Sequence, residues 1–115
     1  DPKTGKITEY RTKTPVSGPH GLTMDKEGNI WYSGNFKGYI GKLDTKTGQF
    51  TEYKTGAARD PHTPLFDKNG ILWFTAQNSN MVGRLDPKTQ NGSDLLTEHS
   101  RSLPDSAPGK AWLAQ

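Results

Sequence analysis

The feature that most constrains this chain is an internal repeat. The segment 19–44, PHGLTMDKEGNIWYSGNFKGYIGKLD, returns 42 residues later as the segment 61–86, PHTPLFDKNGILWFTAQNSNMVGRLD. Nine of the 26 aligned pairs are identical: Pro19/Pro61, His20/His62, Asp25/Asp67, Lys26/Lys68, Gly28/Gly70, Trp31/Trp73, Gly41/Gly83, Leu43/Leu85 and Asp44/Asp86. A second echo has nearly the same period, since DPKTGKITEY at 1–10 reappears as DTKTGQFTEY at 44–53. Repetition at this length indicates an array of supersecondary units.

Each repeat contains four short segments with strand character. In the first repeat these are Leu22–Met24, Ile30–Tyr32, Tyr39–Leu43 and Phe50–Tyr53. Turn residues such as Gly, Asp and Asn separate them, and Gly supplies the positive φ that tight turns need. The second segment is continuously apolar, as expected of a strand that is covered on both faces. Four antiparallel strands in about 40 to 45 residues are typical of a β-propeller blade.

We therefore expect an all-β fold of β-propeller blades, about two and a half in number, which amounts to an incomplete propeller. The repeats occupy residues 1–89, with a blade remnant at 1–18, a blade at 19–60 and a partial blade at 61–99. The segment Leu95–His99 is a displaced substitute for a fourth strand, and residues 100–115 form an irregular tail. The chain begins inside an Asp-Pro-Lys-Thr-Gly turn, so we expect a piece of a longer protein.

Composition excludes several functional classes. The net charge is +3, but the lysines lie in turn-like strings mixed with acidic residues, so no nucleic-acid partner is expected. The chain has no cysteine, which rules out disulfides and thiolate metal sites. No apolar run approaches the roughly 20 residues of a membrane span. An incomplete propeller would also expose sheet edges and blade faces, so self-association through open blade edges is expected.

The repeated histidines are the sharpest candidate for chemistry. His20 and His62 each follow a proline and precede the first strand of a repeat. Equivalent residues of adjacent blades should lie side by side at one mouth of the central channel. Neutral imidazoles placed in this way can hold a divalent metal, or one can act as a general base. Asp60, two residues before His62, could add a carboxylate to the site.

A structural alternative stands beside this one: a repeated histidine can simply bond the backbone of the neighbouring blade. The same choice applies to Asn35 and Gln77, which follow the second strand of each repeat. Their amides could bind a polar ligand, or they could be satisfied within their own turns. Trp31 and Trp73 are expected to fill the contacts between blades, and Tyr32 and Phe74 to pack there as well.

Four motifs carry a resemblance to a known family: Pro-His-Gly-Leu, Gly-Asn-Ile-Trp-Tyr, Tyr-Ile-Gly-Lys-Leu-Asp and Thr-Gly-Gln-Phe-Thr-Glu-Tyr. Through them the chain resembles the virginiamycin B lyase (streptogramin B lyase) family over residues 1 to about 89. The resemblance implies a seven-bladed propeller, often exported to the periplasm or secreted. It implies a Mg²⁺-dependent carbon–oxygen lyase that opens a cyclic depsipeptide antibiotic at its ester by elimination, and hence a role in antibiotic resistance. The ligand would be a small or peptide-like molecule at the channel mouth.

Carried over to this chain, the resemblance implies catalytic duty for His20 and His62 and metal binding for His62 and Asp60. Asn35 and Gln77 would contact the substrate. A non-catalytic propeller that serves as a recognition or scaffold module is the competing hypothesis. A lactonase-like calcium propeller is disfavoured, because no Glu stands at an expected channel-lining position.

Overall fold

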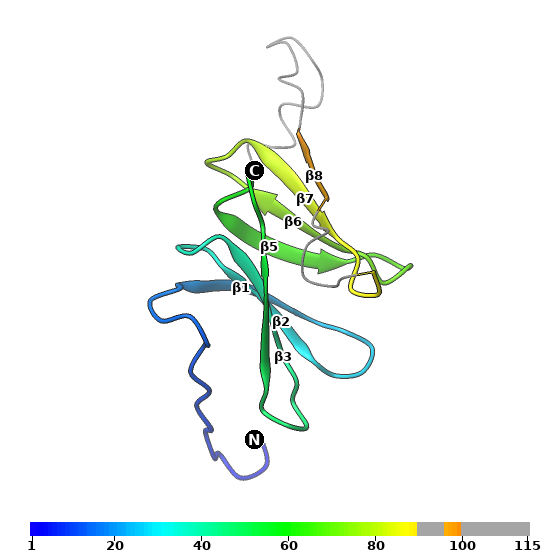
Figure 1. Ribbon diagram of the computed structural model, residues 1–115. Helices are drawn as coiled ribbons and strands as arrows, with labels where there is room; N and C mark the ends of the chain where they lie inside the picture. The colour runs from blue at the N-terminus through cyan, green and yellow to red at the C-terminus, as the bar shows by residue number, and fades with distance from the viewer. Residues whose placement is uncertain (90–95, 100–115) are drawn as a thin grey trace.

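The structure is a computed structural model, and it describes residues 1–89 together with the backbone of residues 96–99. Its described part contains two antiparallel sheets (Figure 1). The first sheet has the strands β1 (Pro19–Met24), β2 (Ile30–Gly34), β3 (Tyr39–Leu43) and β4 (Phe50–Lys54). The second has β5 (Pro61–Phe66), β6 (Leu72–Ala76), β7 (Met81–Leu85) and β8 (Leu96–His99).

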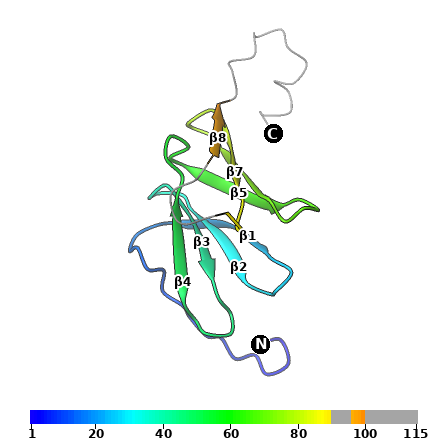
Figure 2. The same ribbon diagram turned by 45° about the vertical axis from the view of Figure 1, so that its right-hand side comes forward.

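Within each sheet the strands follow one another in chain order, so every neighbouring pair is a hairpin. The two sheets stack face to face, and β5 lies against β1 and β2, as the turned view in Figure 2 also shows. This is the arrangement of two adjacent propeller blades, and it confirms the all-β propeller fold. No helix in the described residues is long and apolar enough to cross a bilayer.

A repeated Asp and Trp pair fixes the turn between the first two strands of each sheet. The carboxylate of Asp25 accepts a hydrogen bond from the indole Nε1 of Trp31 at 2.8 Å, and Asp67 accepts one from Trp73 at 2.9 Å. The other oxygen of Asp25 accepts from the backbone N–H of Asn29 at 2.8 Å, which closes the turn. The Asp of the turn and the Trp of the following strand therefore recur together in the sequence, because the hydrogen bond between them requires both residues.

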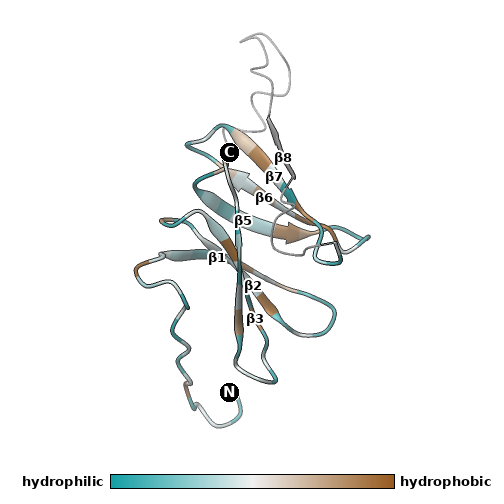
Figure 3. Cartoon of the chain, in the orientation of Figure 1, coloured by the Kyte–Doolittle hydropathy of each residue, from teal (hydrophilic) through white to brown (hydrophobic). Residues whose placement is uncertain are grey.

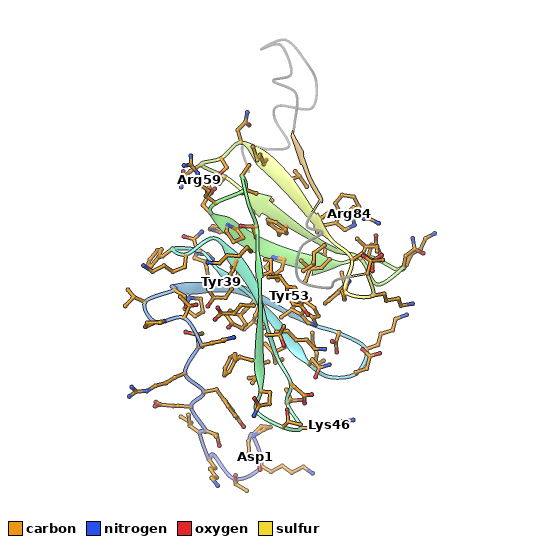
Figure 4. The ribbon with its side chains drawn as sticks, in the orientation of Figure 1. Asp1, Tyr39, Lys46, Tyr53, Arg59 and Arg84 are labelled. Carbon is orange, nitrogen blue, oxygen red and sulfur yellow. The ribbon has the colours of Figure 1, made fainter. Side chains whose placement is uncertain are left out.

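The core lies between the two sheets. Its fully buried members are Trp31, Ile40, Ala58, Leu72, Phe74, Ala76 and Leu85. Trp31 stacks on Tyr53 with ring centroids 5.6 Å apart and meets the edge of Phe66 at 5.6 Å. Figure 3 shows the apolar bands of the strands, and Figure 4 labels Tyr53 near the middle of the molecule. The expectation that Trp31 fills the contact between blades is confirmed.

The aromatic residue after each tryptophan has a different neighbour. Phe74 belongs to the core between the sheets. Tyr32 packs on the opposite side of the first sheet, edge-on to Tyr39 at 5.9 Å and to Phe50 at 6.2 Å. Successive side chains of a strand point to opposite faces, so Tyr32 must face away from Trp31 and from the second sheet. Tyr32 therefore does not lie between the two described sheets, and its expected place in a contact between blades stays a prediction.

A cross-strand glycine lies beneath each of these aromatic rings. Tyr32 pairs with Gly41, and Phe74 pairs with Gly83. A Cβ atom added at Gly41 would lie 2.1 Å from Cζ of Tyr32, and one added at Gly83 would lie 1.9 Å from Cζ of Phe74. Only glycine lets the ring lie flat on the neighbouring strand, which explains why this glycine is identical in both repeats.

The N-terminal echo of the repeat keeps its turn and forms no strand. Gly5 donates its N–H to the carbonyl of Asp1 at 2.8 Å, just as Gly48 donates to Asp44 at 2.8 Å. The following Ile7 is 85% exposed, and residues 6–12 pair with no strand in the described part of the chain. A turn needs only its own residues, whereas a strand needs a partner edge.

Candidate functional site

The two histidines sit on β-bulges, not before the strands as the sequence suggested. In β1, His20 and Gly21 together lie opposite the single residue Ser33 of β2. The same irregularity recurs at residues 62–63 of β5. A bulge places two residues against one, bends the strand and redirects a side chain. The bulges thereby turn both imidazoles out of the regular alternation of their strands.

Ser33 joins the two bulges. Its hydroxyl donates to the carbonyl of His62 at 2.7 Å and accepts from the N–H of Gly21 at 2.9 Å. Ser33 is fully buried, and these two backbone groups satisfy its hydroxyl in place of water. A Cβ at Gly21 would collide with the same His62 carbonyl, so the close approach of β1 and β5 requires glycine there.

The imidazoles of His20 and His62 meet across the contact between the sheets. Their ring centroids are 3.9 Å apart, with the ring planes tilted by 41°. His20 is exposed and His62 half-exposed, so solvent and ligands reach both rings. Nδ1 of His62 lies 2.9 Å from Oγ1 of Thr63, which gives one ring nitrogen a fixed partner. The arrangement can take a proton from a bound molecule and keep it beside a second base.

The Asp60 carboxylate is directed into the turn between β6 and β7. It accepts hydrogen bonds from the N–H of Asn78 at 2.6 Å, the N–H of Ser79 at 3.1 Å and the Ser79 hydroxyl. Partial burial would raise the pKa of Asp60, but these hydrogen bonds outweigh it and hold the pKa below its ordinary value. Both carboxylate oxygens that a metal would use therefore already accept hydrogen bonds.

The described residues do not fit a Mg²⁺ centre. Among them, no group of three or more His, Cys, Asp or Glu side chains is placed to hold a metal ion. Mg²⁺ also prefers oxygen ligands in an octahedral arrangement, and imidazoles supply nitrogen. The metal role expected for His62 and Asp60 therefore stays a prediction that rests on resemblance.

The paired amides differ in their surroundings. The Asn35 side chain donates to the carbonyl of Pro61 at 3.1 Å and to that of Asp60 at 3.4 Å. It thus holds the main chain just before His62. Gln77, its counterpart in the second repeat, is exposed. The predicted contact of both amides with a substrate stays a prediction.

Sequence reasoning missed Ser33 and Gly21. A signal was present for the first, because Ser33 matches Thr75, a second hydroxyl residue 42 positions later. The N–H of Thr63 donates to the Thr75 hydroxyl at 3.3 Å, which repeats the bond inside the first sheet. No such signal marks Gly21, because the matching residue is Thr63.

A groove of about 390 Å³ opens between the sheets at the other end of β1 and β5. Its lining includes Trp31 and Phe66, with Lys26 and Lys88 among its charged residues. Asp25 and Asp67 also line it, but both carboxylates hold the turns described above. The histidine pair does not line this groove, so the groove and the candidate chemistry lie apart.

A model of the virginiamycin B lyase family matches residues 2–110. The chain belongs to the virginiamycin B lyase family. The match to this lyase family covers nearly the whole chain, including the segment that carries both histidines. Comparison with curated protein sequences gave no match.

Solved structures of virginiamycin B lyases are similar to this chain. A selenomethionine-substituted virginiamycin B lyase from Staphylococcus aureus is 31% identical with a TM-score of 0.72, over 83% of this chain and 31% of the lyase. A streptogramin B lyase is 32% identical with a TM-score of 0.72, over 91% of this chain and 33% of its own. A catalytically inactive histidine-to-alanine variant of the S. aureus virginiamycin B lyase with quinupristin is 29% identical, with a TM-score of 0.72, over 87% and 33%. The chain therefore spans about a third of the length of these lyases.

Proposed function

We propose that this chain forms part of a propeller lyase that opens a cyclic depsipeptide of the streptogramin B type at its ester linkage. The observation that carries the proposal is the His20 and His62 pair, with ring centroids 3.9 Å apart on two exposed bulges. A related lyase is inactive when one histidine is replaced by alanine, and its structure was solved with quinupristin. This supports a histidine-dependent reaction on a quinupristin-like molecule.

His62 is the better general base of the two. The main chain on either side of it is held by Asn35 and Ser33, so its imidazole has a fixed place to work from. His20 lies beside it, where it can orient the ring or accept the proton in turn. Fixed placement of a base near its substrate contributes substantially to rate.

The proposed reaction is an elimination. His62 removes the proton from the carbon next to the one that bears the ester oxygen. The electron pair of that C–H bond forms a carbon–carbon double bond, and the bond between carbon and the ester oxygen breaks. The ring opens, the ester leaves as a carboxylate and no water is added. Because such opening would inactivate a cyclic antibiotic, we also propose a role in resistance.

The Mg²⁺ that the family resemblance implies needs ligands. Since the Asp60 carboxylate is engaged in a turn, we propose that any metal site of the whole protein draws on ligands beyond the described residues. Calorimetric titration of this chain with Mg²⁺ tests this: only the heat of dilution is expected. Saturable binding that is lost in Asp60→Asn would show that the turn opens to bind metal.

The test of the lyase proposal is the fate of quinupristin. We expect the whole protein that carries this chain to convert it to a ring-opened product of unchanged mass, whereas hydrolysis would add the mass of one water. His62→Ala should lower the rate at least about 10²-fold, the lower range for loss of a general base. Thr63→Ala removes only the hydroxyl partner of the ring and should lower the rate less than His62→Ala does. No ring opening by the whole protein, or an unchanged rate in both His20→Ala and His62→Ala, would overturn the proposal.

A recognition module is the second candidate. It is favoured by the structural engagement of Asn35 and Asp60, which leaves fewer polar groups free for chemistry. This alternative predicts that quinupristin binds and stays intact. Calorimetry with quinupristin, run beside the mass measurement, separates binding from turnover.

A further inference from the structure

The turn between β2 and β3, residues 35–38, carries an aromatic side chain on the surface. Phe36 is 72% exposed, whereas Trp31, Tyr32 and Tyr39 on the adjoining strands are buried. A single exposed apolar residue is common on protein surfaces, so exposure alone assigns no role. What Phe36 can do depends on where its ring lies and on what holds it there.

Phe36 lies at the end of the sheets where the two histidines meet. Its neighbour Asn35 donates its backbone N–H to the carbonyl of Gly18 at 3.3 Å, two residues before His20. The side chain of Asn35 donates to the carbonyl of Pro61 at 3.1 Å, directly before the second histidine. Figure 1 shows the turn between β2 and β3 on the left, beside the beginning of β1. The Phe36 ring therefore belongs to the same end of the molecule as the imidazoles.

The main chain around Phe36 holds its ring in place. The N–H of Phe36 donates to the carbonyl of Ser17 at 3.0 Å. The N–H of Gly38 donates to the carbonyl of Gly34 at 3.0 Å and closes the turn. A Cβ atom added at Gly18 would lie 2.5 Å from Cδ2 of Phe36, so the ring packs directly on this glycine. A side chain that is fixed in this way loses little conformational freedom when a ligand contacts it.

The position of Phe36 stays open with a sheet on either side. Phe36 is exposed although the second sheet packs against the sheet that carries it. Asn78, the equivalent residue 42 positions later, is exposed although the first sheet precedes its own. A sheet packed on either face of a blade therefore leaves this turn position in solvent, and we expect the same in a longer propeller.

The two repeats differ in what lies beside this turn. Asp60 stands where Gly18 stands, and its carboxylate accepts a hydrogen bond from the N–H of Asn78 at 2.6 Å. Gly18 has no side chain, and the Phe36 ring covers it instead. The candidate site is therefore polar beside the second histidine and apolar beside the first.

We propose that the Phe36 ring binds an apolar side chain of the cyclic depsipeptide, an assignment that rests on the lyase function proposed above. The phenyl ring has no hydrogen-bonding group, and its large apolar surface favours edge-on or offset contact with a second ring. It therefore recognises an aliphatic or aromatic group of the substrate. An apolar anchor on the side of His20 leaves the side of His62 to the ester and to the proton that is removed.

The test uses the whole protein that carries this chain, with quinupristin as the probe. Calorimetry in a His62→Ala background measures binding without turnover. In this background Phe36→Ala should weaken binding roughly tenfold, which corresponds to about 1.4 kcal/mol. The same change should make the heat-capacity change of binding less negative, because less apolar surface is buried in the complex.

Two further variants separate the ring from the turn that carries it. Phe36→Trp keeps an aromatic surface and should retain most of the affinity, with circular dichroism to show that every variant is folded. Asn78→Ala, at the equivalent exposed position of the second repeat, is the matched control and should bind like the wild type. With His62 intact, the loss in Phe36→Ala should appear mainly in KM, since the ring contacts the bound substrate and takes no part in proton removal.

Binding and turnover are measured separately, so the contact of Phe36 and the lyase function can fail separately. Ring opening by the wild type, together with unchanged quinupristin affinity in Phe36→Ala, would overturn the Phe36 contact and leave the lyase function standing. Weaker binding in Phe36→Ala without ring opening by the wild type would support the contact and overturn the lyase function. An equal loss of affinity in Asn78→Ala, or a wild type that does not bind quinupristin, would overturn the contact.

Discussion

The Ser33 hydroxyl donates to the backbone carbonyl of His62 at 2.7 Å and so joins β2 of the first sheet to β5 of the second. The bond reaches the candidate base through its main chain and leaves the imidazole free. The bond also explains why Ser33, a polar residue, is buried in the largely apolar contact between the two sheets. The strands that build the core and the residues that build the site are thus the same elements.

Replacing Ser33 with Ala should destabilise the chain. The change leaves the His62 carbonyl and the Gly21 N–H without their partner inside a buried contact, at a cost of roughly 1–3 kcal/mol. Urea unfolding measures the loss. Thr75→Ala, at the equivalent but exposed position, should change stability by no more than about 0.5 kcal/mol. Equal costs at the two positions would mean that Ser33 does not join the sheets.

A methyl group at Gly41 should be costly because of Tyr32. Gly41→Ala places a Cβ 2.1 Å from Cζ of Tyr32, and overpacking of this kind costs about 1–3 kcal/mol. The cost should fall in a Tyr32→Ala background, with a coupling of at least about 0.5 kcal/mol in a double-mutant cycle. Additive effects would show that the ring does not lie on the glycine.

The Asp60 carboxylate should make stability fall in acid. Its hydrogen bonds outweigh partial burial and lower its pKa in the folded chain below the ordinary 3.8. A carboxyl with a lowered folded pKa contributes stability above its unfolded pKa and loses it as the pH falls through the folded value. Urea midpoints at about pH 7 and about pH 3 should therefore differ less in Asp60→Asn than in the wild type.

Glu27→Gln is the control for that measurement. It removes the same charge from an exposed carboxylate that accepts no hydrogen bond within the described part of the chain. The acid loss of the control should match the wild type. If Asp60→Asn behaves like this control, the turn at 78–79 does not depend on the carboxylate.

Much of the fold could be predicted from the repeat, because turns and apolar strands are determined by residues that lie close together in the sequence. Asp25 and Trp31 recur together, and so do Gly41 and its aromatic partner, since each pair is needed within one sheet. Ile7 shows the limit of such reasoning. It lies in a fourth-strand sequence, yet strand formation depends on an edge outside that sequence.

The candidate site was predictable only in part. The offset between His20 and His62 indicates that they lie near each other, because equivalent residues of stacked sheets are neighbours. The bulges were not predictable, since they depend on a main-chain register that Ser33 and Gly21 set across two sheets. Asp60 is near His62 in sequence, but the N–H groups of a turn 18 and 19 residues later attract its carboxylate.

The most direct test of the account is the nuclear Overhauser effect between the imidazole protons of His20 and His62. Rings with centroids 3.9 Å apart should give a strong cross-peak in the folded chain, and the cross-peak should weaken in Ser33→Ala. Assignment by single His→Gln substitutions makes the pair unambiguous. A folded chain without this cross-peak would contradict the stacking of the two sheets and, with it, the shared histidine site.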